Sequence, residues 1–283
     1  GKNLEYSRGL CIIDAGDRTW ESIILPDEIK ADIQANTLNL LNARDKWARF
    51  DIPLKRGVLL AGEPGTGKTA VCKAIMKEAG EGITCIISNA YALDDEYYVS
   101  TLYEIARDLS PAIVFIEDID MIGEDREEYR MNRSSLVALL AELDGIEEQR
   151  EIVTIATTNS LYALDKALSR RPSRFDRVIT LELPSREQRR ELVRRICRSI
   201  PLSESMQGYL AKVSHSCTPA QVEEILRSLV IERAGELPED DSQCLNISIT
   251  DIDRAVKKIN GRHRSKMGFI GNRTNGDLPQ ANW

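Results

Sequence analysis

The sequence lacks the features of a membrane-spanning, a zinc-binding or a disulfide-stabilised protein. No apolar run approaches the roughly 18 residues of a membrane helix, and the N-terminus has no signal-peptide pattern. Six cysteines and two histidines are present, but there is no C-x-x-C pair, which argues against a zinc site. This cysteine usage is typical of a reducing compartment, so we expect a cytoplasmic or another reducing location.

Basic residues are also fewer than acidic ones. The 38 Lys and Arg against 45 Asp and Glu leave a net charge of −7. Non-specific binding to duplex nucleic acid depends on positive charge, so the balance argues against it. No cluster of aromatic and basic residues indicates a single-strand site, and we do not expect nucleic acid as a partner. The 42% apolar and 29% charged fractions are ordinary for a globular protein of one or two domains.

What the sequence does contain is an alternation of short apolar runs with helix-period segments. The apolar runs are residues 58–61, 83–87, 113–116, 152–156 and 178–183. The helix-period segments between them are residues 68–79, 97–109, 133–143 and 165–168. Near-continuous apolar strands that alternate with helices predict an α/β fold, in which a parallel sheet is covered on both faces.

Beyond Pro184 the pattern is only helical. The predicted helices there are residues 186–199, 205–213, 219–234 and 250–259, with Thr250 as an N-cap and Gly261 as a stop. We therefore expect a large α/β domain followed by a small all-helical domain. The predicted boundaries are an N-terminal segment 1–19, the α/β domain 20–184, the helical domain 185–260 and a tail 261–283.

The most specific chemical signal is the segment GEPGTGKT at residues 62–69. It follows a predicted strand and opens a predicted helix, the context in which G-x-x-x-x-G-K-[ST] forms a phosphate-binding loop. Its glycines let backbone N–H groups converge on phosphate oxygens, and the helix N-terminus adds its positive dipole. Lys68 can reach the β- and γ-phosphates, and the Thr69 hydroxyl can ligate Mg²⁺. We therefore predict a site for a nucleoside triphosphate with Mg²⁺.

Two further strand ends carry polar groups. Residues 112–120, AIVFIEDID, deliver Glu117 and Asp118 at the end of an apolar run, where carboxylates suit Mg²⁺ and water. Residues 152–159, IVTIATTN, end in Asn159, whose neutral amide can orient a water without adding charge. Taken alone, the first is equally an exposed turn and the second an ordinary cap. Their place after the phosphate-binding loop favours a catalytic role for both.

A fourth stretch, LDKALSRRPSRFDR at residues 164–177, is rich in arginine. Its arginines are either a solvated basic face or guanidinium groups offered to a phosphate held by a neighbouring subunit. Arginine suits the second task because its planar fork stays charged.

In this order and at these separations, the four segments resemble the motifs of the AAA ATPase family, over residues 20–259. GEPGTGKT resembles Walker A, AIVFIEDIDMI Walker B, IATTN sensor 1, and ALSRRPSRFDR the second region of homology. The resemblance implies a five-stranded P-loop sheet with a helical lid and Mg²⁺-dependent ATP hydrolysis. It also implies a homo-oligomer, usually a hexameric ring with ATP between the subunits.

The resemblance assigns roles to individual residues. Glu117 takes the metal position together with Thr69, and Asp118 takes the water-activating position. Asn159 would position the water, and Arg174 and Arg177 would be arginine fingers acting in trans. The nucleotide-binding positions that it implies are Ile23, Ile24, Gly62, Glu63, Pro64, Gly65, Thr66, Gly67, Lys68, Thr69, Ala70, Leu192 and Ala220.

The carboxylate pair departs from the family pattern. The family usually has Asp-Glu where this chain has Glu117-Asp118. Asp is one methylene shorter, roughly 1.5 Å, which matters for the activation of a water. The mitochondrial branch that translocates the folded Rieske protein has a similar order, so the exchange is compatible with hydrolysis.

Two other segments depart as well. Threading members carry an aromatic–hydrophobic–Gly triplet, whereas residues 88–98 here are SNAYALDDEYY, and no glycine follows Tyr91. This segment is either a loop that grips a polypeptide or an ordinary surface loop. In the lid, the family's GAD-like turn is replaced by residues 218–221, TPAQ, in which Pro219 fits a helix start.

Two functions remain open at this point. The first is a ring ATPase that remodels or translocates a protein substrate, which Asn159 and the arginines favour. The second is a nucleotide-gated oligomeric scaffold or switch with slow hydrolysis that controls a fused or partner effector. The exchanged carboxylates and the departures around Tyr91 favour the second.

Overall fold

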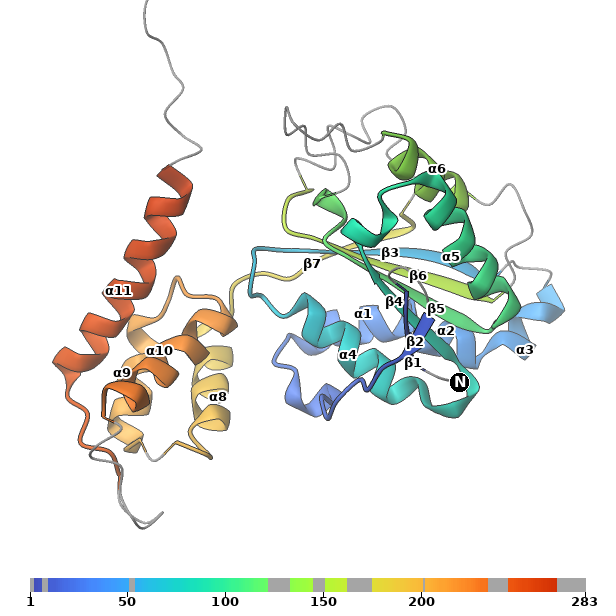
Figure 1. Cartoon of the computed structure of the whole chain (residues 1–283). Helices are drawn as coiled ribbons and strands as arrows, with labels where there is room; N and C mark the ends of the chain where they lie inside the picture. The colour runs from blue at the N-terminus through green and yellow to red at the C-terminus, as the bar shows by residue number, and fades with distance from the viewer. Residues whose placement is uncertain are drawn as a thin grey trace, which may run out of the picture. The chain divides into compact units, whose positions relative to one another are not determined.

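The computed structural model describes residues 3–6, 10–50, 54–121, 133–144, 151–161, 175–200, 202–233 and 244–268. The chain divides into two compact units, Gly1–Glu182 and Leu183–Trp283 (Figure 1). The first unit contains a β-sheet flanked by helices, and the described part of the second unit is built from helices.

The sheet of the first unit has the strand order β2-β1-β4-β5-β6-β3-β7. Its strands are β1 (Asn3–Tyr6), β2 (Leu10–Ile12), β3 (Lys55–Ala61), β4 (Thr84–Asn89), β5 (Ala112–Glu117), β6 (Ile152–Thr158) and β7 (Arg177–Thr180). All neighbouring strands are parallel except β1 and β2, which are antiparallel. The predicted α/β fold with a parallel sheet is confirmed. The expected strand count of five was too low, because β1 and β2 extend the sheet beyond β4.

Helices connect these strands and cover the sheet. In chain order they are η1 (Trp20–Ser22), α1 (Asp27–Ala35), α2 (Leu38–Asn42), α3 (Arg44–Trp47), η2 (Ala48–Phe50), α4 (Lys68–Ala79), η3 (Gly80–Gly82), η4 (Ala90–Leu93), α5 (Glu96–Asp108), η5 (Ile119–Met121) and α6 (Arg133–Asp144). The predicted helix 68–79 has the bounds of α4. The predicted helix 165–168 lies outside the described residues.

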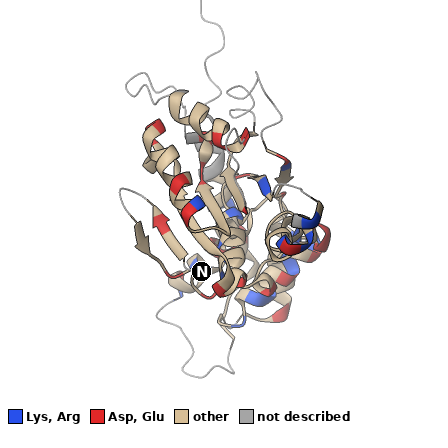
Figure 2. Cartoon of the chain, turned by 90° about the vertical axis from the view of Figure 1, so that its right-hand side faces the viewer, with Lys and Arg blue, Asp and Glu red and all other residues tan. Residues whose placement is uncertain are grey.

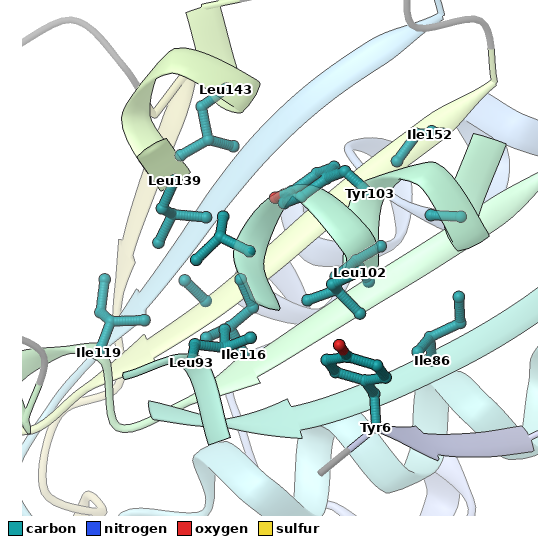
Figure 3. Close-up of a cluster of buried hydrophobic side chains, with 14 of the residues drawn as sticks. Tyr6, Ile86, Leu93, Leu102, Tyr103, Ile116, Ile119, Leu139, Leu143 and Ile152 are labelled. Atoms are coloured by element: carbon teal, nitrogen blue, oxygen red, sulfur yellow. The ribbon is translucent and has the colours of Figure 1, made fainter. Parts of the chain in front are cut away.

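Both faces of the sheet are buried against helices. Successive residues of β5 point to opposite faces, as strand geometry requires. Ile116 belongs to the core formed with α5 and α6, which includes Leu102 and Leu139 (Figure 3), whereas Phe115 belongs to the core formed with α1, α2 and α4. Each such side chain contributes about 1.5–3 kcal/mol when it is fully buried. The buried sheet therefore holds the residues that follow its strands in fixed positions.

The second unit contains α8 (Arg186–Ile196), α9 (Glu204–Val213), α10 (Pro219–Glu232) and α11 (Ile249–Gly268) around one apolar core. The Thr218 side chain caps α10 by accepting from the Gln221 N–H, and Pro219 occupies the first helical position, as expected. On α8, Glu191 pairs with Arg195 at 2.6 Å. Acidic and basic positions are intermixed on the helices in this way (Figure 2).

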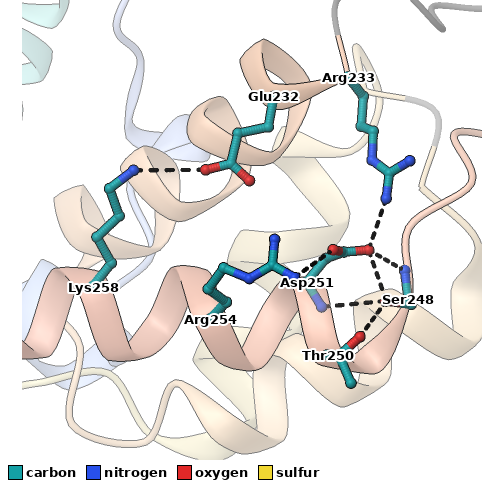
Figure 4. A network of polar contacts seen from close by, with 7 residues as sticks. All are labelled: Glu232, Arg233, Ser248, Thr250, Asp251, Arg254 and Lys258. Carbon is teal, nitrogen blue, oxygen red and sulfur yellow. Dashed lines mark hydrogen bonds and ion pairs between the residues drawn. The ribbon is translucent and has the colours of Figure 1, made fainter.

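The start of α11 differs from the prediction. Thr250 is not the N-cap, because the helix begins at Ile249 and the side chain of Ser248 caps it. The Ser248 hydroxyl accepts from the Asp251 N–H at 3.3 Å, and the Asp251 carboxylate accepts from the Ser248 N–H at 3.0 Å. Arg233, at the end of α10, donates to the same carboxylate at 3.0 Å (Figure 4). This reciprocal pair is stronger than a single cap, so it sets the helix start.

Gly261 does not stop α11, which continues to Gly268. A glycine inside a helix costs only about 1 kcal/mol relative to alanine, so the residues on either side can carry the helix through it. In the part of the chain that the structure describes, no helix combines the length and the apolar character needed to span a bilayer.

Candidate nucleotide site

The predicted phosphate-binding loop, Asp118 and Asn159 lie where β3, β5 and β6 end. These strands are adjacent and parallel, so their carboxyl ends lie along one edge of the sheet. The loop 62–67 follows β3, Asp118 follows β5, and Asn159 follows β6. This edge is where open parallel sheets bind their ligands.

The loop between β3 and α4 has a backbone that only glycine adopts easily. Gly65 (φ +87°) and Gly67 (φ +105°) are left-handed. The Gly62 N–H donates to the carbonyl of Thr158 at 3.3 Å, which ties the loop to β6. A Cβ at Gly62 would lie 2.5 Å from the backbone oxygen of Leu181. The sequence places glycine at the positions where this turn needs it.

The Gly62→Ala variant is expected to lose stability and nucleotide affinity together. The added methyl group meets backbone rather than a flexible side chain, so the loop must move, at a cost of about 1–3 kcal/mol. Denaturant unfolding and titration with an ATP analogue would measure both effects. Gly82→Ala is the matched control, because a Cβ there meets nothing within 4 Å. Equal behaviour of the two variants would contradict this account of the loop.

Lys68, at the start of α4, reaches back over the loop. Its ammonium donates to the carbonyls of Gly62 at 2.7 Å and Glu63 at 3.1 Å, and to the side-chain oxygen of Asn159 at 2.8 Å. Burial lowers the pKa of Lys68, and the charges of Asp118 and Asp120 partly oppose this shift. A poorly solvated ammonium favours an anion, and a phosphate oxygen could replace one of these three acceptors.

Asn159 links Lys68 to the acidic strand end. Its Nδ2 donates to the Asp118 carboxylate at 2.8 Å, while its Oδ1 accepts from Lys68. Asp118 has a left-handed backbone (φ +55°), and its N–H donates to the Thr157 hydroxyl at 3.0 Å. Lys68, Asn159 and Asp118 therefore form one hydrogen-bonded chain across three strand ends.

The sequence reasoning missed Asp120. Its carboxylate accepts from the backbone N–H of Asn159 at 3.1 Å, which fixes the turn after β6. The available signal was its place as the third acid of the segment Glu-Asp-Ile-Asp. Asp120 holds Asn159 by its backbone and so orients the side chain that reaches Lys68 and Asp118.

Glu117 lies on the other side of the strand end. Its Oε1 is buried and has no hydrogen-bond partner among the described residues. Burial raises the pKa of Cys72 in α4, and the Glu117 charge raises it further, so this carboxylate lies near α4. A buried carboxylate oxygen without a partner is costly unless a cation or a donor satisfies it. Together with the Thr69 hydroxyl in the first turn of α4, it offers the oxygen ligands that Mg²⁺ prefers.

Arg177, one of the two predicted arginine fingers, does not join this group. Arg177 is the first residue of β7 and is paired in register with Val58, three residues before the end of β3. Its guanidinium binds Asp32 of α1 instead. Arg174 lies outside the described residues. A role for either arginine in another subunit's site stays a prediction.

The remaining predicted contacts are dispersed. Ile23 is buried just after η1, and Ile24 next to it is partly exposed. Leu192 is partly buried against the core of the second unit, and Ala220 is exposed in the first turn of α10. Their contact with adenine stays a prediction.

The segment proposed to grip a polypeptide is only partly available. Tyr91 is 63% exposed, but Leu93 is fully buried in the core with α5 and α6. Tyr91 is therefore available at the surface and Leu93 is not, and a grip on a polypeptide by this segment stays a prediction. Tyr97, 68% exposed, supplies a second aromatic ring nearby in the chain.

A parallel sheet with a glycine-rich loop leading into a helix, and with carboxylates at a neighbouring strand end, defines a P-loop nucleoside triphosphatase. Residues 58–183 match the model of the ATPase family associated with various cellular activities (AAA). The chain belongs to this AAA family, whose ATPases use ATP with Mg²⁺.

Curated relatives agree with this assignment. The chain is 31% identical to the ATP-dependent zinc metalloprotease FtsH 2 of Sphaerobacter thermophilus, over 91% of the chain and 41% of the relative. It is 34% identical to the cell division cycle protein 48 homolog of Archaeoglobus fulgidus, over 75% of the chain and 31% of the relative. It is 35% identical to protein CdcH of Halobacterium salinarum, over 75% of the chain and 30% of the relative. The chain spans less than half the length of these relatives.

Proposed function

We propose that this chain is the ATPase module of a homo-oligomeric, hexameric ring that hydrolyses Mg²⁺-ATP at subunit interfaces to remodel or translocate a protein substrate. The observation that carries the proposal is the hydrogen-bonded chain from Lys68 through Asn159 to Asp118, beside the buried Oε1 of Glu117, which has no partner within the described residues. The family and the named relatives, a metalloprotease and a cell division cycle protein, support the same conclusion.

Each side chain of the site has a separate task in this proposal. The loop amides and Lys68 bind the phosphates, and Thr69 and Glu117 hold Mg²⁺ or its waters. Bound Mg²⁺ neutralises the charge that develops on the phosphoryl oxygens. Asp118 polarises the attacking water, and the Asn159 amide orients it. Because Asn159 contacts both Lys68 and Asp118, phosphate binding at Lys68 also acts on the position of the base.

Arg174 and Arg177 complete the site of a neighbouring subunit in this proposal. The half-exposed side chain of Arg177 can approach a second copy without leaving its strand. A compartment that keeps thiols reduced is part of the proposal, because all six cysteines are free.

Assembly is expected to depend on nucleotide, because a site shared between subunits links ATP binding to association by mass action. Sedimentation velocity with a non-hydrolysable ATP analogue should show a species several times heavier than the 31.8 kDa chain. The Lys68→Ala variant under the same conditions should not show this shift. A protein that stays monomeric at tens of micromolar with bound analogue would contradict catalysis at subunit interfaces.

An ATPase assay on the assembled protein separates the second candidate function. The shorter Asp118 in the water-activating position favours slow hydrolysis. A protein that assembles with ATP but turns it over very slowly would be a nucleotide-gated scaffold or switch for a fused or partner effector.

A further inference from the structure

Arg177 is part of a set of polar contacts outside the phosphate-binding loop. The set joins α1, the start of β3 and the start of β7, all within the first unit. Its members are Asp32, Asn36, Arg56, Asp176 and Arg177.

One edge of the Arg177 guanidinium is occupied by Asp32. The Arg177 Nε lies 2.9 Å from Oδ2 and 3.2 Å from Oδ1 of Asp32, and Nη2 lies 2.7 Å from Oδ2. This fork on a carboxylate is the arrangement that fixes the plane of a guanidinium. Within the described residues, no bond is recorded for Nη1, which lies on the other edge. The Arg177 side chain is 50% exposed, so part of it lies at the surface.

Asp32 is itself held in place. Asn36, the C-cap of α1, donates from Nδ2 to the Asp32 carboxylate at 2.9 Å and to its backbone carbonyl at 2.8 Å. The Asn36 Oδ1 accepts from the Nε of Arg56 at 3.0 Å. Asp32 is therefore oriented from β3 as well as from its own helix, and its 22% exposed side chain has little freedom.

The backbone before Arg177 is tied to the same strand. The Asp176 carboxylate accepts from the Gly57 N–H at 2.7 Å and pairs with Arg56 at 3.9 Å. Arg177 is thus fixed at its main chain through Asp176 and at its guanidinium through Asp32. Both ends of a long, rotamer-rich side chain are ordered.

We propose that Asp32 is the positioning residue for Arg177: it binds one edge of the guanidinium so that the opposite edge is presented to a phosphate held by a second copy of the chain. This inference rests on the proposed role of Arg177 in trans. An arginine that is ordered before association loses less side-chain entropy when the ring forms, and its charge is aimed where the phosphate charge develops.

The ion pair between Asp32 and Arg177 contributes little to the stability of the fold, because ion pairs that are partly exposed to solvent generally add little free energy. Asp32→Asn should therefore fold normally, and its effect should appear in turnover. With assembly held at saturation, kcat should fall by about tenfold while KM for ATP changes little, since the variant acts on the neighbour's reaction rather than on nucleotide contact. Asp32→Glu, which keeps the charge, should restore part of the loss.

Glu28→Gln is the matched control. It removes one negative charge from the same helix, and Glu28 is exposed, with no contact recorded among the described residues. Its kcat should equal that of the unmodified chain. A comparable loss in both variants would mean that the charge of α1 matters and not the contact with Arg177, which would overturn the inference.

A double-mutant cycle then assigns the effect to the pair. In the Arg177→Ala background, Asp32→Asn should cause no further loss of turnover. If Arg177→Ala lowers turnover but Asp32→Asn alone leaves it unchanged or raises it, Asp32 is not a positioning residue, and the proposed function stands. An equal loss in both backgrounds overturns the inference as well. If Arg177→Ala leaves turnover intact, the in-trans role of Arg177 fails, and the inference fails with it.

Discussion

Lys68→Ala is expected to abolish measurable ATP binding and turnover. The Lys68 ammonium lies over the loop, within 3.1 Å of two loop carbonyls and of the Asn159 amide oxygen. It is the cation that the loop aims at the β- and γ-phosphates, and its charge matters most where phosphoryl charge develops. Loss of one such preorganised group costs at least about 10²-fold in rate. The variant also removes the hydrogen bond from Lys68 to Asn159, the residue whose amide donates to the Asp118 carboxylate.

Steady-state ATPase kinetics and titration with a fluorescent ATP analogue would measure the two effects. Denaturant unfolding run in parallel shows whether the variant is folded, since Lys68 is largely buried. Lys73→Ala is the matched control, because Lys73 lies on the same helix but is exposed, with no contact recorded in the described part of the chain. Near-normal turnover of Lys68→Ala would refute the assignment of the phosphate-binding loop.

The loop and its helix could be predicted from the sequence because their determinants are local. Gly65 and Gly67 need left-handed backbone angles, and the helix that follows starts at Lys68 and ends before Gly80. The start of α11 was also encoded locally. Ser248 with Asp251 three residues later is a reciprocal cap, whereas Thr250 has no such partner in the described contacts.

The added edge of the sheet could not be predicted in this way. β1 has four residues and β2 has three, so neither is long enough to show a clear alternation of apolar and polar residues. The partner that stabilises β1 is β4, whose residues follow about 80 positions later. The preference of a short segment for a strand depends on such neighbours more than on its own composition.

The same limit applies to the site. Alternating strands and helices predict a parallel sheet whose strands end at one edge, so the place of Asp118 and Asn159 at that edge was foreseeable. The contact of Asp120 with the Asn159 backbone and that of Arg177 with Asp32, 145 residues away in the chain, depend on tertiary packing. Family motifs name the residues that act on the ligand, but they do not show which side chains hold those residues in place.

The exchanged carboxylates should have separate effects on catalysis. Asp118→Asn is expected to keep ATP binding and to lose turnover by about 10²- to 10⁴-fold, the usual worth of general-base assistance. Asn has nearly the shape of Asp, so the contact with the Asn159 amide changes little in geometry while the base is lost. Glu117→Gln should mainly raise the Mg²⁺ concentration needed for activity, because the buried Oε1, which has no partner in the described part of the chain, is the oxygen proposed to bind the metal.

Kinetics at several Mg²⁺ concentrations, with ATP-analogue binding measured alongside, would distinguish the two variants. Glu104→Gln on α5 is the control for removal of a carboxylate, since its side chain is exposed. A third variant tests side-chain length. The double exchange Glu117→Asp with Asp118→Glu restores the usual family order, and it should raise turnover if the shorter Asp118 limits the activation of water.

The outcomes bear directly on the assignment of the two positions. Glu117 lies near Cys72 of α4 and Asp118 lies against Asn159, which supports metal binding by the first and water activation by the second. If Glu117→Gln instead traps bound ATP and Asp118→Asn impairs the Mg²⁺ response, the two roles are exchanged, and the strand end is offset by one residue from the family register. Small, equal effects of both changes would remove the catalytic role of this pair. The chain would then be better described as a nucleotide-gated scaffold, in which ATP binding matters and its hydrolysis is slow.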